Sequence, residues 1–177
     1  MLVVEIFNHN LNFKTPGGTS RGILKNKLTW YIKIYYGNKP SVYGLGECGP
    51  IEGLSIESGN KMMNQLKKVQ KSINDLSSLD LSLFPSIQFG IESALKDLKN
   101  GGKRIIFQNS FLEGKPIKIN GLIWMGNKDF MLNQIKSKIE KGFSCLKLKI
   151  GSIDFIEEIS ILKNIRKQFS SKILEIR

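Results

Sequence analysis

The sequence predicts an α+β domain followed by the first two and a half βα units of a TIM-like (β/α) barrel. Apolar runs rich in Val, Ile and aromatic residues come first and are separated by Gly/Pro clusters. After about residue 115, strands alternate with helices. We therefore expect two domains, over residues 1–115 and 116–177. With 41% hydrophobic and 24% charged residues among 177, the chain has the composition of a globular protein.

Three strands are expected at the start of the chain, over residues 2–14, 28–36 and 42–47. They are rich in β-branched and aromatic residues, and the clusters TPGGTSRG and GNKP separate them. Short connections of this kind join neighbouring antiparallel strands. The pattern predicts a three-stranded antiparallel meander.

Two helices are expected to follow the meander. The stretch NKMMNQLKKVQKSI carries apolar side chains every three to four residues. The positions predicted to share its buried face are Met63, Leu66, Val69 or Gln70, and Ile73. The second stretch, PSIQFGIESALKDLKNGG, begins with a proline and ends with a glycine pair, which are typical helix start and stop signals.

The last third of the chain predicts parallel βα units. PIKINGLIW, CLKLKIG and ILEIR are expected to be strands, and the helices between them carry apolar stripes. Asp154, with Glu157 three residues later, is typical of a helix start. The predicted stripe residues are Met131, Ile135 and Ile139 in the first helix, and Phe155, Ile159, Leu162 and Phe169 in the second. Strands joined by helices of this length form parallel sheets with right-handed crossovers.

Two lysines interrupt the apolar strand GFSCLKLKIG. Because strand side chains alternate between faces, Leu146, Leu148 and Ile150 share one face, and Lys147 and Lys149 share the other. If the apolar face packs on helices, the lysines point into the barrel, near the strand ends where barrel active sites lie. Burial and a neighbouring positive charge both disfavour an ammonium group and favour the neutral amine, which acts as a base. An antiparallel strand with one solvated face would show the same alternation, but the flanking crossover helices favour the barrel.

Composition bears on the partners and the compartment. The formal charge of +12 is compatible with an anionic partner, yet the lysines are scattered along helical faces, as in KMMNQLKKVQKS. A small basic RNA-binding module is the rival from another class, but no aromatic-plus-basic cluster of the RNA-binding type supports it. Cys48 and Cys145 lack metal-type spacing, and MLVVEIFNHN has no signal-peptide pattern. We expect a cytoplasmic protein with reduced thiols and with neither nucleic acid nor membrane as a partner.

Five segments, in order, resemble the enolase superfamily in its muconate-lactonizing branch: GGTSRG, GLGECGPIEGLS, FPSIQFGIESALKDL, KINGLIWMG and GFSCLKLKIG. Within the branch, they are most similar to the o-succinylbenzoate synthase family of menaquinone biosynthesis. The resemblance implies an N-terminal capping domain, a barrel, and a Mg²⁺-dependent dehydratase, which is a carbon–oxygen lyase acting on a small anionic substrate. Dipeptide epimerases, N-acylamino acid racemases and muconate cycloisomerases share KxK and remain alternatives.

The family mechanism implies roles for residues that match its motifs. The second lysine of KxK transfers the proton, a role that falls on Lys149, and Lys147 helps to stabilise the anion. The glycine-rich loop that bears Ser20 and Arg21 would close over the substrate, where arginine is suited to hold a carboxylate. A solvated hairpin connection is an equally good interpretation of this loop. Glu47, beside glycine turns, is interpreted as structural, and His9 is given no role.

One departure from the family pattern concerns the metal. The family carries its acidic Mg²⁺ ligands at the ends of the third, fourth and fifth barrel strands, and none of these matches a segment here. Arg177 would face the same way as the first ligand. The sequence is therefore interpreted as an N-terminal fragment that lacks the C-terminal half of the barrel and is inactive alone. Apolar faces left uncovered by that half predict self-association.

Overall fold

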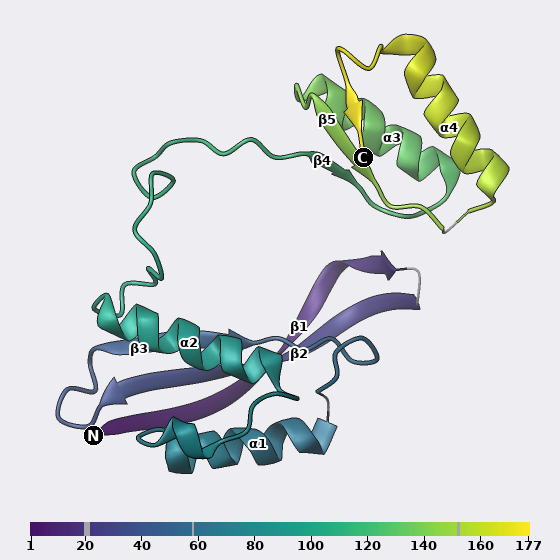
Figure 1. The fold of residues 1–177 in the computed structure, drawn as a ribbon. Helices are drawn as coiled ribbons and strands as arrows, with labels where there is room; N and C mark the ends of the chain where they lie inside the picture. The colour runs from purple at the N-terminus through teal and green to yellow at the C-terminus, as the bar shows by residue number, and fades with distance from the viewer. Residues whose placement is uncertain (20–21, 58, 152) are drawn as a thin grey trace. The chain divides into compact units, whose positions relative to one another are not determined.

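The computed structural model describes residues 1–19, 22–57, 59–151 and 153–177 (Figure 1). Contacts divide the chain into two units, each with its own hydrophobic core. The first unit consists of Met1–Asn12 and Asn26–Glu113, and the second of Phe13–Lys25 and Gly114–Arg177. The far end of the first hairpin thus belongs to the second unit.

The first sheet has three strands in the order β1-β2-β3. They are β1 (Leu2–Thr19), β2 (Gly22–Tyr36) and β3 (Tyr43–Cys48). β2 and β3 are antiparallel, with Trp30 opposite Cys48 and Tyr35 opposite Tyr43. The predicted meander is confirmed.

The first two strands are longer than the sequence pattern predicted. TPGGTSRG was expected to be a loop, yet β1 continues through Thr19 and β2 starts at Gly22. Pro16, which cannot donate a backbone hydrogen bond, is tolerated because β1 is an edge strand of the sheet. The pairing of two long strands therefore outweighs the local turn signals in this segment.

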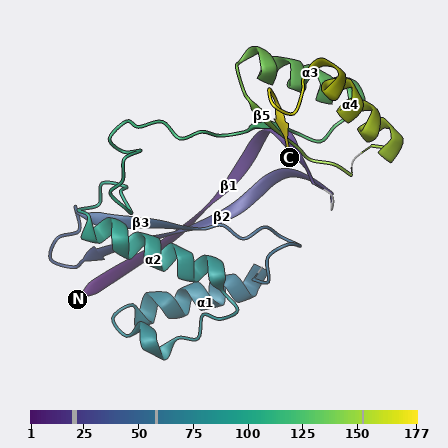
Figure 2. The ribbon, with the colours of Figure 1, turned by 45° about the horizontal axis from the view of Figure 1, so that its top comes forward.

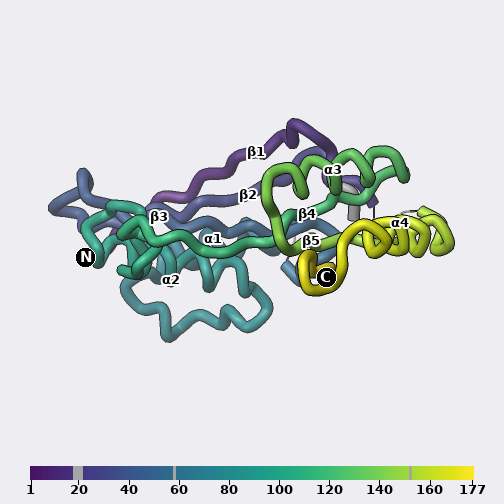
Figure 3. Tube along the Cα trace, turned by 90° about the horizontal axis from the view of Figure 1, so that it is seen from above, coloured from purple at the N-terminus to yellow at the C-terminus, as the bar shows by residue number. Residues whose placement is uncertain are grey.

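Two helices, α1 (Gly59–Ser72) and α2 (Pro85–Lys99), lie on one side of the strands β1 and β2, as Figure 3 shows; the 3₁₀ helix η1 (Leu76–Ser78) lies between them in sequence. The buried face of α1 is Met62, Gln65, Leu66 and Val69. The prediction named Met63 in place of Met62, and Gln70 is exposed. The amide of Gln65 is buried, and its Nε2 donates a hydrogen bond to the carbonyl of Asp80 at 2.9 Å.

Glycines bring α2 directly onto β3. A Cβ atom on Gly46 would collide with the carbonyl oxygen of Gly90, and one on Gly44 with the carbonyl oxygen of Ala94. The motif GLGEC therefore marks a close approach of two backbones. At the end of α2, the buried carboxylate of Asp97 accepts a hydrogen bond from the backbone N–H of Leu45 at 3.0 Å and pairs with Arg104 at 2.6 Å, which ties the helix to β3.

The second unit contains a parallel sheet in the order β4-β5-β6, which confirms the predicted βα units. Its helices lie side by side in Figures 1 and 2. The elements, in chain order, are β4 (Gly121–Ile123), α3 (Lys128–Glu140), β5 (Cys145–Leu148), α4 (Phe155–Gln168) and β6 (Glu175–Ile176).

α4 starts where the sequence predicted, but its buried face differs from the predicted one. The side chain of Asp154 caps the helix by accepting a hydrogen bond from the N–H of Ile156 at 2.8 Å. Phe155, which was predicted to belong to the stripe, is 69% exposed, whereas Ile161 and Ile165 are buried. The apolar positions of α4 are spread around the helix, so its spacing alone did not decide which row faces the sheet.

Candidate functional site

The candidate site is the face of the parallel sheet opposite its helices. Leu146 is fully buried in the core with α3 and α4, and Leu148 packs partly against the same core. Lys147 and Lys149 alternate with these leucines and lie on the other face. Ile150 was expected to share the leucines' packing, but it is 60% exposed, because it lies two residues beyond the last residue of β5, Leu148.

Burial of the two lysines differs from the expectation. Lys147 is exposed and Lys149 is half-buried. Among the described residues, neither α3 nor α4 covers this face, because both pack on the leucine side. The desolvation expected for a closed barrel is therefore not seen for these lysines.

Trp124, just beyond the end of β4, contacts Lys149, just beyond the end of the neighbouring strand β5. Ile123 pairs with Leu148 in the parallel register, so Trp124 and Lys149 follow as neighbours at the strand ends. The backbone N–H of Lys149 continues the ladder by donating to the carbonyl of Ile123 at 3.4 Å. The Nζ of Lys149 lies 4.8 Å from the centroid of the Trp124 ring, a cation–π geometry. Sequence reasoning missed Trp124, although its place at the end of the strand before KxK was a usable signal.

Side chains from the helices hold the two loops that carry these groups. Gln134 of α3 accepts a hydrogen bond from the N–H of Trp124 at 2.9 Å and donates one to its carbonyl at 3.1 Å. The buried carboxylate of Glu158, in α4, accepts a hydrogen bond from the N–H of Gly151 at 2.6 Å. Both strand ends of the site are thus tied to the helix layer.

A second set of polar groups lies toward the start of the strands. Cys145 is directly opposite Glu175, and the Nε of Arg177 pairs with the carboxylate of Glu175 at 2.6 Å. This hydrogen bond from Arg177 holds the pKa of Glu175 below its usual value. Sequence reasoning placed Arg177 on this face but missed Glu175, which the period of two also puts there.

The predicted loop residues Ser20 and Arg21 lie outside the described residues. Their neighbourhood is described at Gly17, which is buried and belongs to the second unit. A Cβ atom built on Gly17 would lie 3.6 Å from the ring of Trp124. The described part of the hairpin end therefore approaches the same tryptophan that contacts Lys149.

Glu47 has structural partners. Its carboxylate accepts a hydrogen bond from the hydroxyl of Thr29 at 2.8 Å and lies 3.5 Å from the Nζ of Lys27. These contacts accord with the structural interpretation of GLGEC. His9 is exposed.

The two thiols are free but differ in their surroundings. Cys48 is fully buried, and this burial, with the nearby carboxylates of Glu57 and Glu47, raises the pKa of its thiol to about 12. Cys145 is half-buried. Because the thiolate is the reactive form, Cys48 should be inert in the folded protein.

A disulfide-exchange reagent is therefore expected to modify Cys145 and spare Cys48 at pH 8. Absorbance of the released thiol should correspond to one cysteine per native chain and to two in urea. In the variant Cys145→Ser, native labelling should nearly vanish. Rapid labelling of that variant would contradict the buried placement of Cys48.

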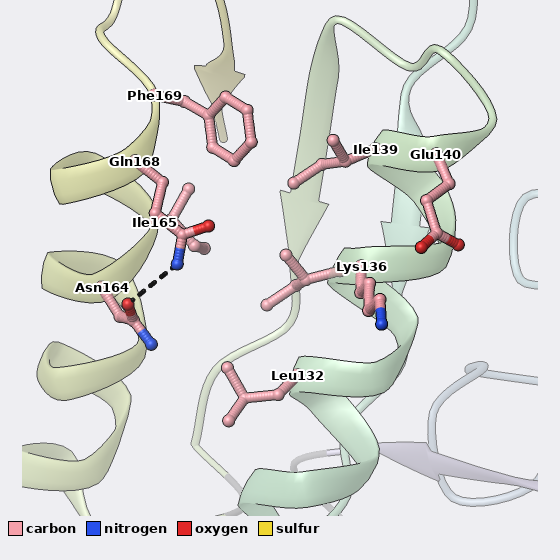
Figure 4. Close-up of a pocket in the computed structure, with 9 residues that line it drawn as sticks. Leu132, Lys136, Ile139, Glu140, Asn164, Ile165, Gln168 and Phe169 are labelled. Atoms are coloured by element: carbon pink, nitrogen blue, oxygen red, sulfur yellow. Dashed lines mark hydrogen bonds between the residues drawn. The ribbon is translucent and has the colours of Figure 1, made fainter.

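A groove of about 250 Å³ opens between α3 and α4 (Figure 4). Its lining is mainly apolar, with Leu132, Ile139 and Phe169 pointing into it and a hydrogen bond of 3.2 Å between Gln168 and Asn164 at its side. It lies in the helix layer and not on the face that carries Lys149. Helix–helix packing accounts for it without a ligand.

Comparisons with known proteins bear on the identity of this fold. No protein-family model matches the chain. Its sequence is 35% identical over 203 residues to o-succinylbenzoate synthase of Desulfotalea psychrophila, covering 95% of this chain and 54% of that protein. The crystal structure of MenC from the same organism matches 99% of this chain and 56% of that chain, with 30% identity and a TM-score of 0.79. Over about half of their length, the chain is similar to members of the enolase superfamily.

Other superfamily members show the same fold at lower identity. The o-succinylbenzoate synthase of Thermosynechococcus elongatus, complexed with Mg, is 19% identical with a TM-score of 0.76. A dipeptide epimerase of Cytophaga hutchinsonii is 22% identical with a TM-score of 0.68. The resemblance to the muconate-lactonizing branch is confirmed. The chain spans about half the length of these relatives.

The superfamily's metal does not fit the residues seen here. Within the described ranges, no three His, Cys, Asp or Glu side chains gather where they could hold a metal ion. The carboxylate on the site face, Glu175, is engaged by Arg177. We therefore assign no metal ligand among the residues that the structure describes.

In the described parts of the chain, no helix has both the length and the apolarity needed to cross a membrane.

Proposed function

We propose that this chain forms the proton-transfer half of an o-succinylbenzoate synthase active site, with Lys149 as the base. Sequence identity of 35% to the Desulfotalea psychrophila enzyme supports the choice within the superfamily. The observation that carries the proposal is the position of Lys149, on the face of the parallel sheet opposite the helices and just beyond the last residue of β5. Catalytic groups of (β/α) barrels lie at this end of the strands.

The proposed reaction is a dehydration. The neutral Nζ of Lys149 accepts the proton on the carbon alpha to a carboxylate: an N–H bond forms, the C–H bond breaks, and its electron pair stays on the substrate, delocalised into the carboxylate. The ammonium then returns the proton to the departing hydroxyl, so that water leaves and a carbon–carbon double bond remains. The positive charge of Lys147, on the same face, favours the anion formed between these steps.

Magnesium is proposed to belong to the complete enzyme and not to these residues. The Thermosynechococcus elongatus synthase holds Mg in its active site. We propose that the ligands come from the half of the barrel that this chain does not match, and that residues 1–177 alone neither bind Mg²⁺ tightly nor catalyse the reaction. The substrate would then be a small anionic molecule of menaquinone biosynthesis. It would be handled in the cytoplasm, where the free thiols of Cys48 and Cys145 stay reduced.

A chimera tests the proposal. Residues 1–177 are joined to the half of the Desulfotalea psychrophila synthase that the chain does not match. We expect Mg²⁺-dependent formation of o-succinylbenzoate, an aromatic product that ultraviolet absorbance detects. Neither half alone should show this activity. Circular dichroism and thermal melting would establish that the chimera is folded. A folded chimera without dehydratase activity would count against the proposal.

The same chimera separates the two leading assignments. The dipeptide epimerase of Cytophaga hutchinsonii, complexed with D-Ala-L-Val, shares the fold, so the fold alone does not choose between them. Epimerisation of that dipeptide without dehydration would favour the epimerase assignment. In the structural matches the identity is 30% to MenC of Desulfotalea psychrophila and 22% to the epimerase, which leads us to expect the opposite.

The hairpin end is proposed to close over the substrate, with Arg21 and Ser20 as its polar contacts. The approach of Gly17 to Trp124 supports this placement. In the chimera, Arg21→Ala should lower kcat/KM by roughly 10- to 100-fold, as expected for a charge-assisted hydrogen bond to a carboxylate. The matched control is Lys25→Ala, an exposed cation in the same hairpin end, which should change little.

Self-association of residues 1–177 is also proposed. Trp124, Ile150 and Ile173 are large apolar side chains of the second unit that are 42% to 67% exposed. Exposed groups of this kind recruit other chains. Light scattering over a range of protein concentrations would test the proposal, and a concentration-independent monomer would contradict it.

A further inference from the structure

We propose that Trp124 is a positioning residue for Lys149: its indole face holds the lysine ammonium at the mouth of the site. The inference rests on the proposed function, in which Lys149 is the base. It adds a group that KxK does not contain and that reaches the site from the preceding strand.

The geometry distinguishes Lys149 from the other lysine of the motif. Trp124 follows Ile123, the register partner of Leu148, so the indole and Lys149 meet on the same face of the sheet. The 4.8 Å between Nζ and the ring centroid is well within the range of about 6 Å for attraction between a cation and an aromatic face. Lys147 is paired instead with Leu122, which has no aromatic face.

The tryptophan is held at both backbone groups. The side-chain amide of Gln134 bonds to the N–H of Trp124 at 2.9 Å and to its carbonyl at 3.1 Å. On the lysine side, the carboxylate of Glu158 fixes the N–H of Gly151, two residues beyond Lys149. Indole and ammonium are therefore presented from two anchored loops, which limits the positions that Nζ can take.

The contact has a consequence for catalysis. An aromatic face attracts the ammonium but not the neutral amine, so the attraction grows as Lys149 takes the proton. An interaction that is stronger in the transition state than before it raises kcat and leaves KM little changed. Trp124→Leu in the chimera should thus lower kcat by roughly 3- to 30-fold, the range expected for one cation–π contact.

The first experiment is made on residues 1–177 by NMR spectroscopy and requires no enzymatic activity. In residues 1–177 with ¹³C-labelled lysine, the Cε protons of Lys149 should resonate upfield of those of the other lysines, because Cε is bonded to the Nζ that lies 4.8 Å from the centroid of the indole ring. The signal is assigned with Lys149→Arg. Trp124→Leu should return it to the position of the other lysines, whereas Phe155→Leu, which removes an exposed aromatic ring elsewhere in the unit, should not. A Lys149 signal that never leaves the bulk position would overturn the inference.

The second experiment is kinetic and separates this inference from the proposed function. In the chimera, Trp124→Phe should recover most of the kcat lost in Trp124→Leu, because phenylalanine keeps an aromatic face. Equal losses in both variants, or a change confined to KM, would reduce Trp124 to a packing role. If Lys149→Ala were fully active, the proposed function would fail instead, whatever the tryptophan variants did.

Discussion

Lys149→Ala is expected to lower the turnover of the chimera by several orders of magnitude. General-base steps alone contribute roughly 10²- to 10⁴-fold, and the same amine is proposed to act again as the acid. The side chain lies just beyond β5 on the face opposite the helices, where a truncation removes no core contact. Initial rates of product absorbance at saturating substrate would measure the loss.

Matched variants separate the proton transfer from a general effect of charge. Lys163→Ala removes an exposed lysine from α4 and should leave the rate unchanged. Lys147→Ala should give an intermediate loss, since it removes a favourable charge and not the base. Near-normal dehydration by Lys149→Ala, with bound Mg²⁺ and an unaltered melting temperature, would end the assignment of the base.

Gly46→Ala is expected to lower the free energy of unfolding of the first unit by about 3 kcal/mol, the upper part of the usual range for overpacking. The added methyl group would meet the carbonyl oxygen of Gly90 in α2, and neither backbone can move aside without separating the helix from β3. Urea unfolding followed by circular dichroism would measure the change as a lower midpoint.

Gly37→Ala is the control for this effect. Its Cβ would make ordinary contact with the side chain of Val3 at 3.5 Å, and the backbone there does not need glycine. The control should change stability by less than about 1 kcal/mol. Equal effects of the two substitutions would show that the close approach of α2 and β3 is not what requires Gly46.

Local patterns determined much of this protein. The period of two separated Lys147 and Lys149 from Leu146 and Leu148, and the alternation of strands and helices predicted a parallel sheet. Helix signals at Pro85 and Asp154 were sufficient to locate the starts of α2 and α4. These features depend on neighbours along the chain, and for that reason they are readable without the fold. The order of five short segments was also enough to predict the superfamily.

Which face of each helix is buried could be determined only from the tertiary structure. Apolar side chains lie on more than one row of α1 and α4, so the sequence offered several faces, and packing against the sheets selected the rows of Met62 and Ile161. The predicted loop TPGGTSRG was too long, because β1 continues to Thr19 and β2 begins at Gly22; Ser20 and Arg21 lie outside the described residues. β1 and β2 are neighbours in the sheet, and both run into residues whose turn signals predicted a loop.

The register between β4 and β5 decided which side chain contacts Lys149. Trp124 is 25 positions earlier in the chain, and nothing local relates the two residues. They meet because Ile123 and Leu146 are buried in one core and thereby align β4 with β5. The sequence by itself determined which face each lysine takes; only the packing of that core decided what lies beside it, because strand register is set by contacts between elements and not within them.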